Sequence, residues 1–118
     1  MSPLEKYKAT AAATSSSNNQ LIFIFDEILK LLLSAKKAFG EKNHEVKFKS
    51  LTRVIEVFYI LKTGIDPESM DERTRVIDAF YGSTIHQLEN INMKGAEAEE
   101  LQSIIEAVSE IRAALVSG

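Results

Sequence analysis

Residues 20–39 form a segment that is apolar around most of its circumference when it is placed on an α-helix. At about 100° per residue, one face collects Leu21, Phe25, Ile28, Leu32, Ala35 and Phe39. Apolar residues on both sides widen this face to about 240°, whereas a helix that buries one face needs a stripe of about 100°. We therefore expect further apolar surface, in this molecule or in another, to pack against this helix.

The chain of 118 residues is long enough for one domain with a modest core. Its 45% hydrophobic and 26% charged residues are typical of a globular protein. It has no cysteine, which excludes disulfides and thiolate metal sites. Neither Asp26 nor Glu27 lies at Glu-x-x-His spacing, and we find no nucleophile elbow or glycine-rich phosphate loop. The sequence therefore predicts a protein that is not an enzyme and that uses no metal or other cofactor.

The N-terminus lacks the apolar core of a signal peptide, and charged residues interrupt the apolar segment that follows. These features predict a cytoplasmic protein that does not insert into a membrane. Residues 1–60 carry nine Lys/Arg and six Asp/Glu, whereas residues 61–118 carry five and eleven. This asymmetry indicates either two differently solvated faces or one basic and one acidic docking surface. No block of like charges indicates a surface that binds nucleic acid.

The pattern divides the chain into a flexible N-terminal arm, 1–19, and a four-helix bundle domain, 20–118. Two apolar residues, Leu4 and Tyr7, could anchor the arm as a strap. We expect helices from Asn18 or Asn19 to Gly40, and over 45–63, 69–92 and 96–116. The apolar arc of the second helix spans about 200°, while the fourth helix has one narrow stripe. Short connections favour an all-α, antiparallel up-down-up-down bundle with a mobile arm.

One histidine, His86, is expected on the outer side of the third helix, where a phosphorelay module would carry its reactive residue. In such modules a lysine and a glycine follow the histidine one turn later. Here Glu89 and Asn90 follow, and a carboxylate is unfavourable beside an incoming phosphoryl group. A solvated surface histidine is therefore the preferred interpretation, and phosphotransfer stays an alternative.

The order of features resembles the flagellin export chaperones of the FliS family. That family has a tyrosine in a short arm, a Thr/Ser-rich joint, and a helix reading roughly Leu-x-x-x-Leu-Tyr-Asp. The similar elements here are Tyr7, residues 14–17, and the run from Leu21 to Asp26. Late in the chain, residues 111–115 partly match Leu-x-x-x-Arg-x-Ala-Trp. The chain departs from the family pattern in having Ser17-Asn18 in place of Ser-Pro, Phe25 in place of tyrosine, and Leu115 in place of tryptophan.

The resemblance implies a cytosolic chaperone that binds the C-terminal segment of newly made flagellin and prevents its premature polymerisation. It also implies delivery of flagellin to the flagellar type III export gate, with a flagellar regulator as a possible further partner. The wide apolar arcs predict client contacts at Ile24, Leu31, Val57, Ile60 and Leu61. The family motif adds Phe25 and Asp26. An alternative is a self-associating bundle whose arcs meet in a homodimer, so both a monomer and a weak dimer remain open.

Overall fold

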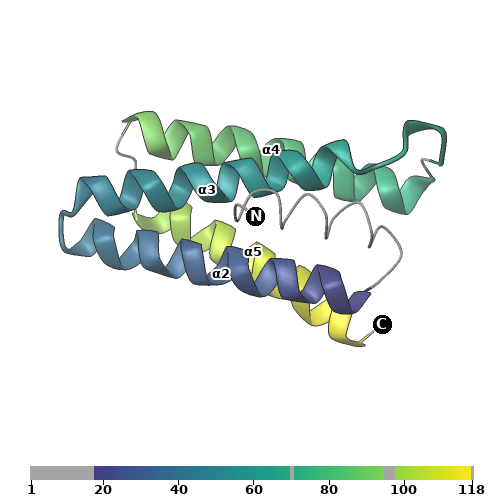
Figure 1. Cartoon of the computed structure of the whole chain (residues 1–118), viewed down its shortest axis with the longest axis horizontal. Coiled ribbons are helices and arrows are strands. Elements are labelled where there is room, and N and C mark those ends of the chain that lie inside the picture. Colours follow the sequence, from purple (N-terminus) through teal and green to yellow (C-terminus); the bar gives the residue numbers. More distant parts are fainter. Residues whose placement is uncertain (1–17, 70, 95–97, 118) are drawn as a thin grey trace, which may run out of the picture.

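The computed structural model describes residues 18–69, 71–94 and 98–117, and the helices among them follow one another in antiparallel order (Figure 1). The α-helices are α2 (Asn18–Gly40), α3 (His44–Thr63), α4 (Glu72–Lys94) and α5 (Ala98–Ser117). A short 3₁₀ helix, η1 (Pro67–Ser69), connects α3 to α4. The predicted all-α, up-down-up-down bundle is confirmed. The arm, with Leu4 and Tyr7, lies outside the described residues.

The turn between α2 and α3 has clear local causes. Helix α2 ends at Gly40, as predicted, and Lys42 adopts the left-handed conformation at φ 57°. The side chain of Asn43 then caps α3, because its Oδ1 atom accepts a hydrogen bond from the backbone N of Val46 at 3.3 Å. This cap starts α3 at His44, one residue before the predicted boundary.

The third helix differs from the prediction at its start. It was expected from residue 69, but α4 begins at Glu72 because Asp71 caps it. The backbone N of Thr74 donates to Oδ1 of Asp71 at 2.8 Å. Before the cap, Asp66 accepts a hydrogen bond from the backbone N of Glu68 at 2.9 Å and supports η1. Asp71 thus satisfies the backbone N–H of Thr74, which a longer α4 would have bonded internally.

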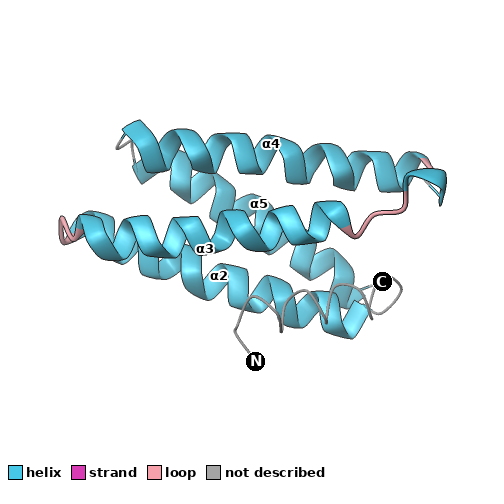
Figure 2. Cartoon of the chain, turned by 45° about the horizontal axis from the view of Figure 1, so that its top comes forward, coloured by secondary structure: helices cyan, strands magenta, loops and turns pink. Residues whose placement is uncertain are grey.

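The helices do not contact one another equally. Helix α2 packs along α3 on one side and along α5 on the other, and α3 packs along both α2 and α4. Contacts between α4 and α5 are few, and Figures 1 and 2 show these two helices diverging toward the C-terminus. The two helices with wide apolar arcs are therefore the two that have extensive contacts with two neighbours each.

An aromatic cluster attaches α4 to α3. The buried ring of Phe58 on α3 contacts the rings of Phe80 and Tyr81 on α4, with centroid distances of 6.2 and 5.7 Å. Burial raises the pKa of Tyr81 to about 12, so its hydroxyl stays protonated at physiological pH. Apart from Phe25, the rest of the core is aliphatic and comes from all four of these α-helices, including Ile28, Leu32, Leu51, Val54, Leu88, Ile91, Leu101, Ile104 and Val108.

Replacement of Lys42 by glycine should stabilise the fold. Lys42 is exposed and has a positive φ, a conformation that glycine adopts without steric cost. We expect Lys42→Gly to raise the free energy of unfolding by about 0.5–1 kcal/mol. Urea denaturation followed by circular dichroism measures this change, with Lys42→Ala as the control that keeps the strain. An unchanged or lower stability in the glycine variant would contradict the proposed backbone strain.

Candidate binding surface

The apolar residues selected from the sequence as partner contacts fall into two groups. The bundle buries Ile24, Phe25, Val57 and Leu61, which all belong to the hydrophobic core. Leu31 on α2 and Ile60 on α3 are half-buried and pack against the same core from its edge. The structure therefore brings only the second pair to the surface.

The width of the apolar arcs is not a sound reason to predict Ile24, Val57 and Leu61 as client contacts. The sequence interpretation treated the width of the apolar arcs as surplus surface. In the structure, α2 has α3 and α5 beside it, and α3 has α2 and α4, so the arcs are needed inside the bundle. A helix with two neighbours buries a wider arc than a helix with one. Whether these residues contact a partner stays untested.

Leu31 and Ile60, the two half-buried residues, both lie along the seam between α2 and α3. Its register follows from a hydrogen bond between the hydroxyls of Ser50 and Ser34, with 3.4 Å between their Oγ atoms. Because the helices are antiparallel, Ile60 lies level with the N-terminal half of α2 and Leu31 with the middle of α3. We define the α2/α3 surface as the four large apolar residues on the outer side of this seam: Phe23, Leu31, Val46 and Ile60.

Two members of the α2/α3 surface are not among the client contacts predicted from the sequence. Phe23 and Val46 are exposed, at the two ends of the seam. The spacing of Val46, Arg53 and Ile60 was a usable signal, because residues seven apart share one face of a helix. Arg53 is half-buried on that stripe and adds a positive charge in the middle of the apolar surface.

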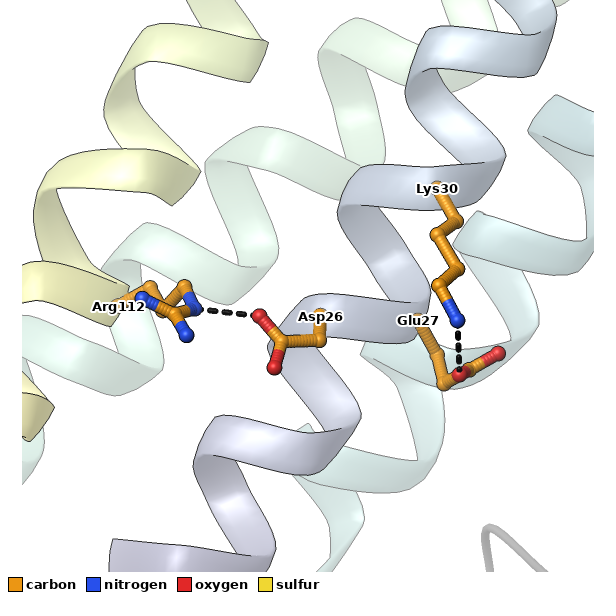
Figure 3. A network of polar contacts seen from close by, with 4 residues as sticks. All are labelled: Asp26, Glu27, Lys30 and Arg112. Atoms are coloured by element: carbon orange, nitrogen blue, oxygen red, sulfur yellow. Dashed lines mark hydrogen bonds and ion pairs between the residues drawn. The ribbon is translucent and has the colours of Figure 1, made fainter.

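Asp26, which the family motif had suggested as a client contact, has a structural partner. Its Oδ1 atom accepts a hydrogen bond from Nε of Arg112, which fastens α2 to α5 (Figure 3). Glu27 pairs separately with Lys30 at 3.3 Å on the same helix. The Asp26–Arg112 pair joins the two sequence motifs that carry the family resemblance, although 86 residues separate them. A role of Asp26 in binding stays a prediction.

A pocket of about 350 Å³ lies between α3 and α4, away from the α2/α3 surface. Its lining residues are Tyr59, Lys62, Gly82, Ile85, His86 and Glu89. Glu89 accepts a hydrogen bond from the Tyr59 hydroxyl at 3.1 Å, which raises the pKa of that phenol. Lys62 Nζ donates to Oδ1 of Asp78 at 2.8 Å.

The pocket also contains the histidine that was considered for phosphotransfer. His86 is exposed, and its Nε2 atom lies 3.4 Å from the amide nitrogen of Asn90. Glu89 lines the same pocket, as its spacing from His86 in the sequence predicts. The arrangement therefore places a carboxylate in the same pocket as the imidazole.

Among the described residues, no group of three or more His, Cys, Asp or Glu side chains is arranged to hold a metal ion. None of the described helices is both long enough and apolar enough to cross a membrane.

Comparison with known proteins gives two matches. The sequence model of the family described as "Flagellar protein FliS" matches residues 1–116. The flagellar secretion chaperone FliS of Escherichia coli (strain K12) is 27% identical over 104 residues, which cover 85% of this chain and 76% of that protein.

Proposed function

The chain belongs to the FliS family of flagellar proteins, and we propose that it is a flagellar export chaperone that binds the C-terminal segment of newly made flagellin. In this proposal the protein acts without catalysis in the bacterial cytosol. It keeps flagellin from polymerising early and supports its delivery to the type III export apparatus. A flagellar regulator remains a possible further partner.

The α2/α3 surface is the observation that carries the proposal. Leu31 and Ile60 are half-buried, so their outer atoms can still be covered by an apolar partner. Two parallel rows of side chains along a helix seam are a suitable groove for an amphipathic helix. Each Å² of apolar surface covered contributes about 25 cal/mol. A segment that is disordered when free spends about 2–5 kcal/mol or more on ordering, which keeps binding reversible.

Substitution of the two half-buried residues should weaken flagellin binding. We expect Leu31→Asp and Ile60→Asp each to weaken binding of a synthetic flagellin C-terminal peptide by at least about tenfold, because a carboxylate then has to be desolvated under the client helix. Isothermal titration calorimetry measures the affinity. The matched control is Val76→Asp, since Val76 is an exposed valine on α4 and lies outside the α2/α3 surface.

Two results would contradict parts of this proposal separately. Tight peptide binding that survives both α2/α3 substitutions would show that flagellin uses another surface. Absence of binding to the unmodified protein, with circular dichroism showing a folded helical chain, would reject flagellin as the client. Binding of the expected kind should also show a negative heat-capacity change, since apolar surface is buried.

A further inference from the structure

The α2/α3 surface has a positive charge at its centre. Arg53 lies between Val46 and Ile60, seven residues from each, so the three side chains share one stripe of α3. The serine hydroxyls that bond across the seam set the register of the two antiparallel helices, and Arg53 and Leu31 each lie three residues from their serine. The two residues are therefore level with each other. A helix that covers Leu31 and Ile60 also covers Arg53.

The guanidinium of Arg53 has no partner among the described residues, whose ion pairs and hydrogen bonds do not include it. The charged side chains around it are paired within their own helices. Nζ of Lys30 lies 3.3 Å from a carboxylate oxygen of Glu27 (Figure 3). Nζ of Lys49 lies 2.9 Å from a carboxylate oxygen of Glu45. Arg53 thus combines partial burial with an uncompensated charge.

Covering this charge with apolar side chains alone would be unfavourable. A guanidinium that loses water without gaining a hydrogen-bonding partner costs free energy. The planar fork of arginine matches a carboxylate, which can accept two parallel hydrogen bonds from it. A client helix that offers an aspartate or glutamate to Arg53 avoids the cost, whereas an equally apolar helix without the acid does not.

The nearest carboxylate along α3 gives an independent check on the sign of the client charge. Glu56 follows Arg53 by three residues, is also half-buried, and lies about 60° around the helix from the stripe. It would repel a client carboxylate placed at Arg53 and attract a client cation. Removal of the Glu56 charge should therefore strengthen binding of an acidic client residue and weaken binding of a basic one.

The spacing on α3 also predicts where the client carboxylate lies in its own helix. Seven residues correspond to about 10 Å along the axis, which separates Arg53 from Val46 on one side and from Ile60 on the other. A client helix that lies along the seam repeats its face with the same spacing. Its acidic residue should have apolar residues about seven positions before and after it, in a segment of about 15 residues.

We propose that Arg53 pairs with an aspartate or glutamate in the middle of the apolar face of the bound flagellin helix, and so selects that segment over other amphipathic helices. This inference rests on the proposed function, because it concerns the same surface and the same client. The apolar side chains of the α2/α3 surface supply contact area, and Arg53 supplies specificity.

Isothermal titration calorimetry of the full chain with a synthetic flagellin C-terminal peptide tests the pair. Arg53→Gln should weaken binding by at least about tenfold. The matched control Lys49→Gln removes the same charge one turn away, from an exposed side chain, and should change the affinity by less than about threefold. Glu56→Gln should strengthen binding. Circular dichroism establishes that each variant is folded.

A series of peptides, each with one Asp or Glu replaced by Asn or Gln, locates the client side of the pair. One replacement should weaken binding to the unmodified protein by at least about tenfold and should have little effect on binding to Arg53→Gln, because the pair is already absent there. A peptide with lysine at that position should bind Arg53→Glu more tightly than it binds the unmodified protein.

Three results would overturn this proposal: an Arg53→Gln variant that binds the peptide as tightly as the unmodified protein does or more tightly, an equal loss in Lys49→Gln, or a peptide series in which no position is coupled to Arg53. If Leu31→Asp and Ile60→Asp still weaken binding in these cases, flagellin remains the client of the α2/α3 surface. Absence of peptide binding to the folded, unmodified protein would instead reject the proposed function, and the pair with it.

Discussion

Phe58→Ala is expected to lower the free energy of unfolding by about 3–5 kcal/mol. The Phe58 side chain is fully buried and contacts Phe80 and Tyr81 of α4. Its removal leaves a cavity at the junction of α3 and α4. Helix α4 has few contacts with α5 that could compensate, so the loss should affect the attachment of the whole helix.

Urea denaturation followed by circular dichroism measures the effect, and the neighbouring Tyr59→Ala serves as the control. Tyr59 is exposed and its hydroxyl bonds to an exposed carboxylate, so its truncation should change stability by no more than about 1 kcal/mol. Hydrogen exchange should show that amides of α4 lose the most protection in Phe58→Ala. Equal losses in the two variants would contradict the packing described between α3 and α4.

The helices could be predicted from the sequence because their signals are local. The end of α2 at Gly40 and the break at Gly64 before Pro67 are visible as residue types. The start of α4 was placed three residues too early because two aspartates, Asp66 and Asp71, compete to bond backbone N–H groups in the same short stretch. Only the geometry of the chain decides which of them caps the helix.

The binding surface was harder to predict, because an apolar arc does not reveal how many neighbours a helix has. Leu31 follows Ile24 by seven residues and lies on nearly the same side of α2. Nevertheless Ile24 is buried and Leu31 is half-exposed. The difference depends on the register and crossing of α3 over α2, which come from tertiary packing. The Asp26–Arg112 pair has the same origin, since no local pattern connects residues so far apart.

Ile24→Asp is expected to unfold the protein, and not simply to weaken client binding. Ile24 is 0% exposed in the hydrophobic core, so the new carboxylate would lose its hydration. We expect a loss of at least about 4 kcal/mol, a large part of the 5–15 kcal/mol that stabilises a typical domain. Thermal unfolding monitored by circular dichroism should show a much lower midpoint or no transition.

The comparison of Ile24→Asp with Ile60→Asp distinguishes the core from the surface. Ile60 is half-buried at the seam, so a carboxylate there can turn toward water and the fold should persist. A folded Ile24→Asp variant with weakened flagellin binding would mean that the side of α2 carrying Ile24 opens in solution. The wide apolar arcs would then again be candidates for client contacts. An unfolded Ile24→Asp beside a folded Ile60→Asp would assign the width of the α2 arc to the bundle itself. Loss of flagellin binding in Ile24→Asp would then follow from unfolding and would not identify a binding site. Loss of binding in the folded Ile60→Asp variant would place the flagellin site at the α2/α3 surface.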